Sequence, residues 1–211
     1  MKTFLFQGDS ITDTNRVDDN EDNFGLGCGY ALLLASDFLK NRKDEFRFIN
    51  RGNSGDRITD VYVRIKEDII NLKPDMMSIL IGVNDVSHEL TQNCGVTPEK
   101  FEKIYSMLIE EIKEALPEIK IFILEPFIMK GIHTEARWDE FSCEVHKMAK
   151  ASANIAEKFN LEFIPLQDKF DVAAADGNHR YWSVDGIHPS AAGHQLIKEE
   201  LQKAIIKTLD S

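Results

Sequence analysis

The sequence predicts an α/β domain in which a parallel β-sheet lies between two layers of α-helices. Three observations support this fold class. Short apolar runs of strand length alternate along the chain with longer segments of helical periodicity. The apolar runs are continuous, which is typical of strands covered on both faces. The connections between them have ordinary lengths for crossover units of a single sheet.

Five short runs are predicted to form the strands. They lie at residues 3–6, 46–50, 76–81, 119–124 and 161–164. Because helical segments separate consecutive strands, neighbouring strands are expected to be parallel. We predict a three-layer αβα sandwich around a five-stranded parallel sheet with the flavodoxin-like order 2-1-3-4-5.

Helices are predicted between the strands and after the last one. Apolar residues recur every three or four positions in residues 61–72, 101–116, 141–159 and 197–209. Residues 30–39 are also expected to be helical, and a short helical stretch is expected beyond the fifth strand. The longest connections without such periodicity are residues 13–29 and 127–138, and these two loops are candidate rims of a site.

Length and charge limit the classes of protein that fit. With 211 residues, no internal repeat and no Gly/Ser/Pro-rich linker, the chain is expected to form one domain over residues 1–211. The formal net charge of −11 would repel polyanions, so we expect no nucleic-acid partner and no membrane partner. Neutral small molecules suit this charge balance better, and a homo-oligomer is compatible with it.

The cysteines and the N-terminal residues favour a cytoplasmic protein. Cys28, Cys94 and Cys143 are odd in number and lack metal-ligand spacing, which favours reduced thiols. The chain leads directly into its first strand, and no apolar run approaches the ~18 residues of a membrane span. The histidines lack the spacing of zinc ligands, so no metal site is expected.

Polar residues and glycines follow the predicted strands at the points where the strands end. The segments concerned are residues 8–10, 50–56, 82–85 and 125–127, and a further one, residues 185–189, precedes the last helix. Ligands of open α/β sheets bind beyond the carboxyl ends of the strands. These segments are therefore expected to converge on one edge of the sheet.

The side chains in these segments suffice for acyl transfer. Ser10 could act as a nucleophile if a base took its proton, and His188 suits that task because it lies three residues from a carboxylate and precedes a proline. Asp185 could then fix the imidazole tautomer. The backbone N–H groups of Ser10 and Gly55 and the side-chain amide of Asn84 could form an oxyanion hole.

Two neighbouring features allow other interpretations. Ser54 also sits in a glycine turn after a strand, but its segment lacks the last glycine of a Gly-x-Ser-x-Gly elbow. The glycines at positions 25, 27 and 29 lack the spacing of a dinucleotide-binding loop and do not directly follow a strand. We therefore favour Ser10 as the nucleophile and a plain loop around the three glycines.

Four blocks of this sequence resemble those of the SGNH (GDSL) hydrolases, in the same order and over essentially the whole chain. The blocks are Gly8-Asp9-Ser10-Ile11-Thr12-Asp13, Asn50-Arg51-Gly52-Asn53-Ser54-Gly55-Asp56, Gly82-Val83-Asn84-Asp85 and Asp185-Gly186-Ile187-His188-Pro189-Ser190. The resemblance implies a nucleophile at Ser10, oxyanion donors at Gly55 and Asn84, and a triad completed by His188 and Asp185. Residues 27–30, 74–79 and 188–194 are most similar to the intracellular acetylxylan esterase branch.

The expected function is that of a serine ester hydrolase that removes small acyl groups, such as acetyl, from carbohydrate esters without a cofactor. Its partner would be a small-molecule or oligosaccharide ester. Phe127, Tyr30 and Trp182 are candidate substrate-binding residues. Two alternatives stay open: a lysophospholipase, thioesterase or arylesterase with a longer acyl pocket, and a non-catalytic flavodoxin-like module that binds carbohydrate or nucleotide.

Overall fold

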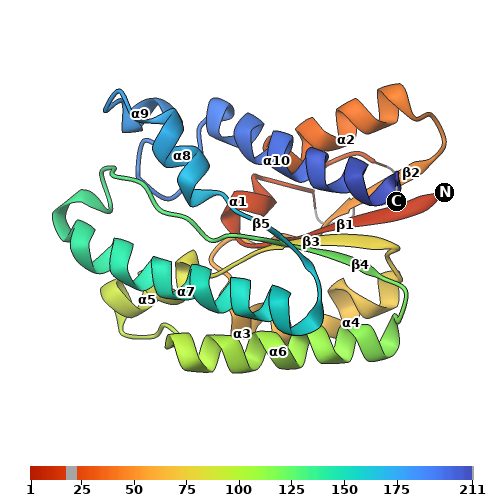
Figure 1. The fold of residues 1–211 in the computed structure, drawn as a ribbon, viewed down its shortest axis with the longest axis horizontal. Coiled ribbons are helices and arrows are strands. Elements are labelled where there is room, and N and C mark those ends of the chain that lie inside the picture. Colours follow the sequence, from red (N-terminus) through yellow and green to blue (C-terminus); the bar gives the residue numbers. More distant parts are fainter. Residues whose placement is uncertain (18–22, 211) are drawn as a thin grey trace.

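The computed structural model describes residues 1–17 and 23–210, and it confirms the predicted sheet. Five parallel strands lie in the order β2-β1-β3-β4-β5 (Figure 1). They are β1 (Lys2–Gly8), β2 (Phe46–Asn50), β3 (Met76–Leu80), β4 (Lys120–Leu124) and β5 (Glu162–Ile164). Residues 18–22, which belong to the predicted rim loop 13–29, lie outside the described residues.

The register of the central strands aligns their carboxyl ends. Phe6 of β1 pairs with Asn50 of β2 on one side and with Ser78 of β3 on the other. Gly8, the last residue of β1, pairs with Leu80, the last residue of β3. The segments that follow these three strands therefore start from one edge of the sheet, as the sequence predicts.

Helices cover both faces of the sheet (Figure 1). On one face, α2 (Tyr30–Asn41) packs against α10 (Ala191–Leu209), and on the other face α6 (Pro98–Ala115) packs against α7 (Trp138–Phe159). The short helices α8 and α9 lie on the same side as α10. They span Gln167–Ala173 and His179–Trp182.

The helix predicted over residues 61–72 is wrong as a single element. The segment divides into α3 (Ile58–Val63), α4 (Ile65–Asp68) and a 3-10 turn, η1 (Ile70–Leu72). The first break falls at Arg64, whose guanidinium donates to Asp68 and forms an ion pair with Asp56 in the loop after β2. The apolar stripe continues through the break, so periodicity alone could not reveal it.

Among the described residues, the sequence also does not predict α1 (Ser10–Asp13), α5 (Val83–Gln92) and the 3-10 turn η2 (Glu135–Arg137), and the single helical stretch expected beyond β5 is two helices, α8 and α9. The first turn of α5 buries two polar side chains, Asn84 and Asp85, between two valines. A helix whose buried face is partly polar produces only a weak apolar stripe, which explains why the pattern missed it.

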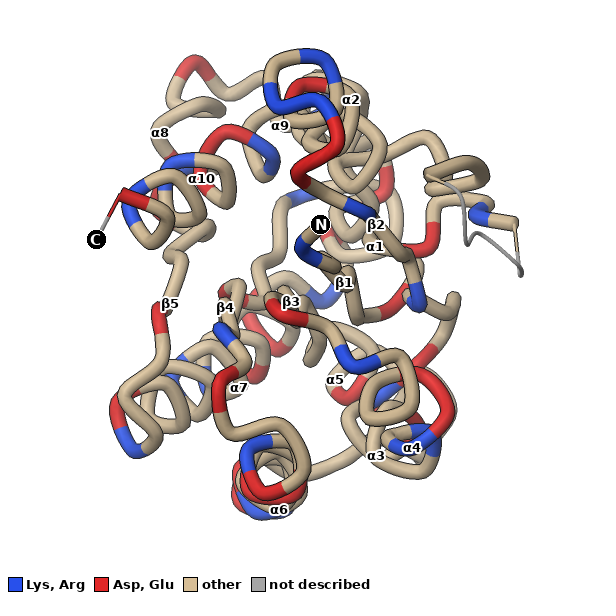
Figure 2. The backbone as a smooth tube through the Cα atoms, turned by 90° about the vertical axis from the view of Figure 1, so that its right-hand side faces the viewer, with Lys and Arg blue, Asp and Glu red and all other residues tan. Residues whose placement is uncertain are grey.

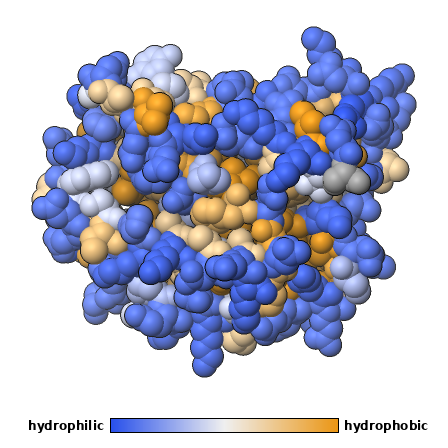
Figure 3. All heavy atoms as spheres, in the orientation of Figure 1, coloured by the Kyte–Doolittle hydropathy of each residue, from blue (hydrophilic) through white to orange (hydrophobic). Residues whose placement is uncertain are grey.

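Charged residues lie around the outside of this core. Figure 2 shows Lys and Arg interspersed with Asp and Glu along α6 and α10. In Figure 3, the visible face is mostly hydrophilic, with hydrophobic residues gathered in its middle between the two helix layers. Among the residues that the structure describes, no helix combines the length and apolar character needed to cross a bilayer.

Four phenylalanines from three strands form the centre of the sheet's packing. The ring of Phe4 lies 4.9 Å from that of Phe6, 5.9 Å from Phe48 and 6.2 Å from Phe122, measured between centroids. The Phe4 side chain is fully buried. This cluster therefore joins β1, β2 and β4 through side-chain contacts across the sheet.

We expect Phe4→Ala to lower the free energy of unfolding by about 3–5 kcal/mol, because it leaves a cavity among these rings. Urea denaturation monitored by circular dichroism measures the loss. The control is Val63→Ala, which truncates a side chain that is 82% exposed and should change stability by no more than about 0.5 kcal/mol. Equal effects of the two substitutions would contradict the packing described here.

Candidate active site

The turn from β1 into α1 presents Ser10 at the sheet edge. Gly8 has a φ of +156°, and a Cβ there would overlap the Leu80 carbonyl and the Thr12 hydroxyl. Asp9 caps α1, because its Oδ1 accepts a hydrogen bond of 2.9 Å from the N–H of Ile11. Ser10 is the first residue of α1 and is partly exposed. A glycine and a capping carboxylate together hold this serine at the end of the strand.

A hydrogen-bonded relay connects Ser10 to the segment before α10. The Ser10 Oγ lies 2.7 Å from Nε2 of His188, and Nδ1 of His188 lies 2.6 Å from Oδ2 of Asp185. The other carboxylate oxygen, Oδ1, accepts hydrogen bonds from the backbone N–H groups of Ile187 and His188 at 2.9 and 2.8 Å. The structure thus brings the three predicted triad residues together, with His188 between Ser10 and Asp185 as the sequence predicts.

A buried serine that the sequence analysis did not single out stabilises this segment. The Ser183 hydroxyl donates to the backbone carbonyl of His188 at 2.9 Å and accepts from the N–H of Gly186 at 2.9 Å. Gly186 has a φ of +94°, and a Cβ at that position would overlap the Thr134 hydroxyl. The tight turn from Asp185 to His188 therefore depends on a glycine conformation and an internal hydroxyl bridge.

The hydrogen bond between Asp185 and His188 shifts the pKa of both residues. Partial burial opposes ionisation of Asp185, but the hydrogen bonds from the His188 side chain and from the two backbone N–H groups outweigh it and hold the pKa of Asp185 well below its usual range. The hydrogen bond to Asp185 raises the pKa of His188, with desolvation acting against it. Asp185 therefore stays ionised and favours the imidazolium form of His188.

Asp9 adds a second carboxyl group beneath the serine. Burial raises the pKa of Asp9 to about 7, against the opposing effects of the Ile11 hydrogen bond and the charge of His188. Its Oδ2 is buried and has no hydrogen-bond partner among the described residues. The pKa of Asp9 thus falls near neutral pH, and its charge when ionised contributes to the raised pKa of His188.

Three N–H donors lie on the segments that meet at Ser10. Neither the backbone N–H of Ser10 nor that of Gly55 has an acceptor within the part of the chain that the structure describes. Gly55 adopts a φ of +88°, and nothing lies within 4 Å of the position its Cβ would take. The Asn84 amide donates one N–H to the Asp56 carbonyl at 3.1 Å and retains a second N–H. These are the donors predicted for the oxyanion hole.

The loop after β2 is fastened to the loop after β1. The Asn50 side chain donates to the carbonyls of Thr12 and Leu26 at 2.7 and 2.9 Å. Both the hydroxyl and the backbone N–H of Ser54 donate to Oδ2 of Asp13, at 2.5 and 3.1 Å. Ser54 thus anchors the loop to a carboxylate, and it forms no hydrogen bond with a histidine among the described residues, which argues against its role as a nucleophile.

The structure corrects two of the predicted substrate-binding residues. Tyr30 is fully buried, with its hydroxyl 2.9 Å from the Thr12 hydroxyl. Phe127 is also fully buried and stacks on Phe170 at a centroid distance of 4.2 Å. Both predictions are wrong, because these rings fill the core beneath the sheet edge and present no surface to a ligand. Trp182 is half-buried, packs edge-on against Tyr181, and stays a prediction.

His194, a largely buried residue of α10, contacts Tyr30 at the start of α2. Its ring stacks on Tyr30 at 6.3 Å, and its Nδ1 accepts a hydrogen bond of 3.3 Å from the Tyr30 backbone N–H at the start of α2. Desolvation, reinforced by the charge of His188, lowers the pKa of His194 to about 4. The residue is therefore neutral at physiological pH and serves as an acceptor at the beginning of α2.

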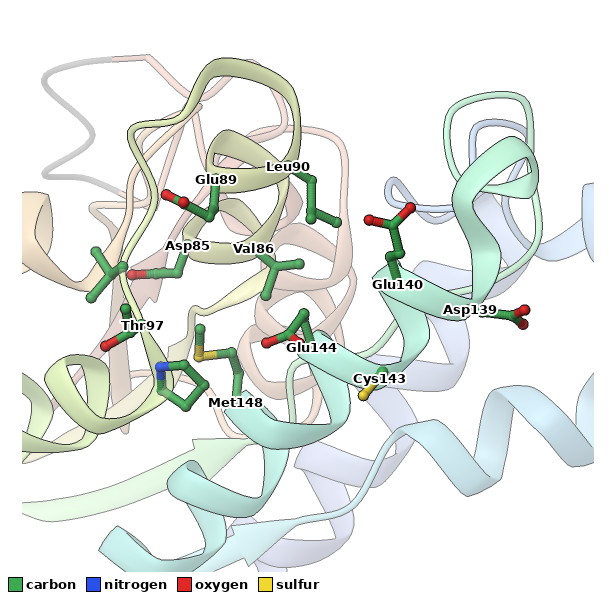
Figure 4. A pocket seen from close by; sticks show the side chains of 12 residues that line it. Asp85, Val86, Glu89, Leu90, Thr97, Asp139, Glu140, Cys143, Glu144 and Met148 are labelled. Carbon is green, nitrogen blue, oxygen red and sulfur yellow. The ribbon is translucent and has the colours of Figure 1, made fainter.

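Other features of the described residues lie apart from the triad. No group of three or more His, Cys, Asp or Glu side chains in the described ranges could hold a metal ion. A groove of about 420 Å³ opens between α5 and α7 (Figure 4). Its apolar part includes Val86, Leu90 and Met148, and its lining contains none of the three triad residues. This groove is therefore separate from the residues predicted to carry the chemistry.

Sequence comparisons agree with the resemblance that the motifs indicate. Residues 6–196 match the model of the GDSL-like Lipase/Acylhydrolase family. The chain is 31% identical over 210 residues to an acetylxylan esterase of Geobacillus stearothermophilus, an alignment that covers 95% of this chain and 92% of that protein. It is 22% identical over 221 residues to an isoamyl acetate-hydrolyzing esterase of Saccharomyces cerevisiae, covering 96% of this chain and 85% of that protein.

Solved structures that are similar to this one include proteins of the same family. A protein from Parabacteroides merdae described as a GDSL-like lipase superimposes with a TM-score of 0.90 at 35% identity, covering 96% of this chain and 94% of the other. A catalytic mutant of the acetylxylan esterase of Geobacillus stearothermophilus gives a TM-score of 0.86 at 28% identity, with 96% and 93% covered. The fold and the family that the sequence predicts are both confirmed.

If His188 acts as the general base, activity requires its neutral form, so kcat/KM should rise with pH through a midpoint above the ordinary histidine value of 6.5. Asp185→Asn removes the interaction that raises the pKa of His188. We expect the midpoint to move to lower pH and kcat to fall about a thousandfold or more, because the imidazole loses its correct tautomer. A pH series of initial rates with p-nitrophenyl acetate measures both effects.

The matched control is Asp168→Asn, which removes an exposed carboxylate from α8. It should leave the midpoint and kcat as in the wild type. An Asp185→Asn protein with wild-type kcat and midpoint would show that another group orients His188.

Proposed function

The chain belongs to the GDSL-like lipase/acylhydrolase family, and from this premise we propose that it removes small acyl groups, acetyl above all, from carbohydrate esters through an acyl-enzyme intermediate on Ser10. The family and its esterase relatives make the chain a carboxylic ester hydrolase. This assignment decides against the non-catalytic binding module that the sequence left open. The observation that carries the mechanism is the relay from Ser10 through His188 to Asp185, with contacts of 2.7 and 2.6 Å.

In the first half of the proposed reaction, Ser10 Oγ attacks the ester carbonyl while its proton passes to Nε2 of His188. The carbonyl π-bond opens onto oxygen and produces a tetrahedral oxyanion. His188, now an imidazolium stabilised by Asp185, returns the proton to the leaving alkoxide as the carbon–oxygen bond breaks. The products of this half are the free alcohol and an ester of the Ser10 hydroxyl.

In the second half, water replaces the alcohol. His188 takes a proton from water, hydroxide adds to the acyl carbon, and a second tetrahedral oxyanion forms. Collapse of this intermediate expels Ser10 Oγ, which recovers its proton from His188, and releases the carboxylic acid. Each proton that leaves a reacting oxygen thus passes through His188, and the side chains finish in their starting states.

The N–H groups of Ser10 and Gly55 and the Asn84 amide are proposed to stabilise both oxyanions. Two of the three are backbone groups held by a helix start and a positive-φ glycine, so little reorganisation is needed when charge develops. Removal of one such donor typically costs about 3 kcal/mol of transition-state stabilisation. Asn84 is held by its hydrogen bond to the Asp56 carbonyl.

Two observations support the proposed preference for acetate: the substrates in the names of two relatives and the solvent exposure of His188. The names of the two esterase relatives describe an acetylxylan esterase and an esterase that hydrolyses isoamyl acetate. The His188 side chain is 50% exposed, so the reacting groups lie near the surface, where an ester on a larger molecule can reach them. Within the same family, a lysophospholipase, thioesterase or arylesterase is the alternative.

A panel of p-nitrophenyl acetate, butyrate and octanoate, together with acetylated xylo-oligosaccharides, tests this proposal. We expect the highest kcat/KM on acetate among the nitrophenyl esters and release of acetate from the oligosaccharides. Ser10→Ala should lower kcat by about four orders of magnitude or more, because the nucleophile is lost.

Ser36→Ala, which removes an exposed hydroxyl from α2, serves as the control and should keep wild-type rates. Rates that rise from acetate to octanoate would overturn the proposed acyl preference. A Ser10→Ala protein with wild-type activity would overturn the mechanism.

A further inference from the structure

A second cavity lies beside the triad segment and differs from the groove between α5 and α7 in its charge. Its volume is about 380 Å³, which falls within the range of about 300–1,000 Å³ that is common for small-molecule sites. We call it the basic cleft. Its lining consists of Lys130, Gly131, Ile132, Glu135, Gly177, Asn178, His179 and Arg180.

Both walls of the basic cleft are attached to the segment that carries Asp185 and His188. On one side, the N–H of Ile132 donates to the Val184 carbonyl at 3.1 Å, and the N–H of His133 donates to the Asp185 carbonyl at 3.0 Å. On the other side, α9, which contains Arg180, ends at Trp182 and leads directly into that segment. Figure 1 shows α9 and the connection from β4 to α7 at the same end of the molecule.

The backbones of the two segments approach too closely for any side chain to intervene. A Cβ on Gly131 would overlap the backbone N–H of Gly186, so the first wall lies directly against the triad turn. Val184, which is 52% exposed, belongs to the same turn. The basic cleft therefore contacts the same turn that carries His188, whose Nε2 lies 2.7 Å from the Ser10 hydroxyl.

The charges of the basic cleft are unusual for this acidic chain. Lys130 and Arg180 line it together with a single carboxylate, Glu135, whereas the chain as a whole has a net charge of −11. Among the residues that the structure describes, no carboxylate lies within 4.0 Å of the charged nitrogens of Lys130 or Arg180. The groove between α5 and α7, by contrast, is lined by five carboxylates and by no lysine or arginine (Figure 4). These carboxylates belong to Asp85, Glu89, Asp139, Glu140 and Glu144.

Two further contacts describe the polar groups of the cleft. The Lys130 Nζ lies 5.6 Å from the centre of the Trp138 ring, a cation–π contact that leaves its N–H groups available. Nδ1 of His179 is buried and forms no hydrogen bond with any described group. The cleft thus offers an ammonium and a guanidinium to a ligand, beside a histidine whose Nδ1 is enclosed.

We propose that the basic cleft is a substrate subsite that binds a carboxylate, so that the preferred ester is one on an acidic carbohydrate with a uronic acid unit near the acyl group. This inference rests on the proposed function, since it places the carboxylate next to an ester at Ser10. Two fixed positive charges facing one negative charge leave a net charge of one, which matches a monoanion better than a phosphate dianion. A guanidinium also suits the two oxygens of a carboxylate.

The test compares two acetate esters that differ in one group: a monoacetylated methyl glucuronoside and the equally acetylated methyl glucoside. For the wild type at low salt, we expect the ratio of KM for the neutral ester to KM for the acidic ester to be about five, and to approach one as ionic strength rises. Lys130→Gln and Arg180→Gln should each lower that ratio about two- to threefold, and the double variant should bring it near one.

Lys150→Gln is the matched control, because it removes one exposed positive charge from α7 outside the cleft. It should retain the wild-type ratio. A wild-type ratio near one, or an equal loss of the ratio in Lys150→Gln, would overturn the proposed subsite. Thermal melting of each variant shows whether it is folded.

Binding of unacetylated methyl glucuronoside to the Ser10→Ala protein separates this proposal from the reaction itself. NMR titration should give a lower Kd for methyl glucuronoside than for methyl glucoside. Arg180→Gln should reduce the ratio of the two Kd values about two- to threefold, and the double variant Lys130→Gln/Arg180→Gln should bring that ratio near one. Equal Kd values for the two sugars would overturn the subsite even if the ester hydrolysis proceeds as proposed. Selective binding by a protein whose activity does not depend on Ser10 would instead overturn the mechanism and leave the subsite in place.

Discussion

The hydrogen bond between Ser10 Oγ and His188 Nε2 joins residues 178 positions apart in the chain, and the site depends on it. Neither residue could reach the other without the parallel sheet, because β1 delivers Ser10 to the carboxyl edge and the segment before α10 returns His188 to the same edge. The paired ends of β1, β2 and β3 bring the loops with Gly55 and Asn84 to this edge as well. A single geometric constraint, the common direction of the strands, thus brings together the proposed nucleophile, the proposed base and the proposed oxyanion donors.

Around this contact, the protein holds polar groups that are costly to bury. Asp9 is fully enclosed and has one oxygen without a described partner, while Asp85 is enclosed and accepts from the N–H of Ile58. Burial raises the pKa of both carboxyl groups. Asp185, in contrast, receives hydrogen bonds on both oxygens and stays ionised. The pKa values of these three carboxyl groups thus shift in opposite directions because their surroundings differ.

Much of this arrangement could be predicted from the sequence because the relevant patterns are local. Apolar runs identified every strand, and the polar residues after them located the site. The helix break at Arg64 and the helix α5 escaped prediction. The break involves ion pairs of the Arg64 side chain with Asp56 and Asp68, which the spacing of apolar residues does not reveal, and α5 buries the polar side chains Asn84 and Asp85. The buried positions of Tyr30 and Phe127 could not be predicted either, because composition does not tell whether an aromatic ring points into the core or toward a ligand. The basic cleft combines segments about 50 residues apart in sequence, and only the folded chain brings them together.

The central claim is that Ser10 becomes covalently acylated with the help of His188. Labelling with a fluorophosphonate followed by peptide mass spectrometry tests it most directly, because the reagent phosphonylates an activated serine and releases fluoride. The account predicts one adduct per chain, located on the peptide that contains Ser10, and a strongly reduced labelling rate in His188→Ala. An adduct on Ser54 or another residue, or labelling of His188→Ala at the wild-type rate, would contradict it.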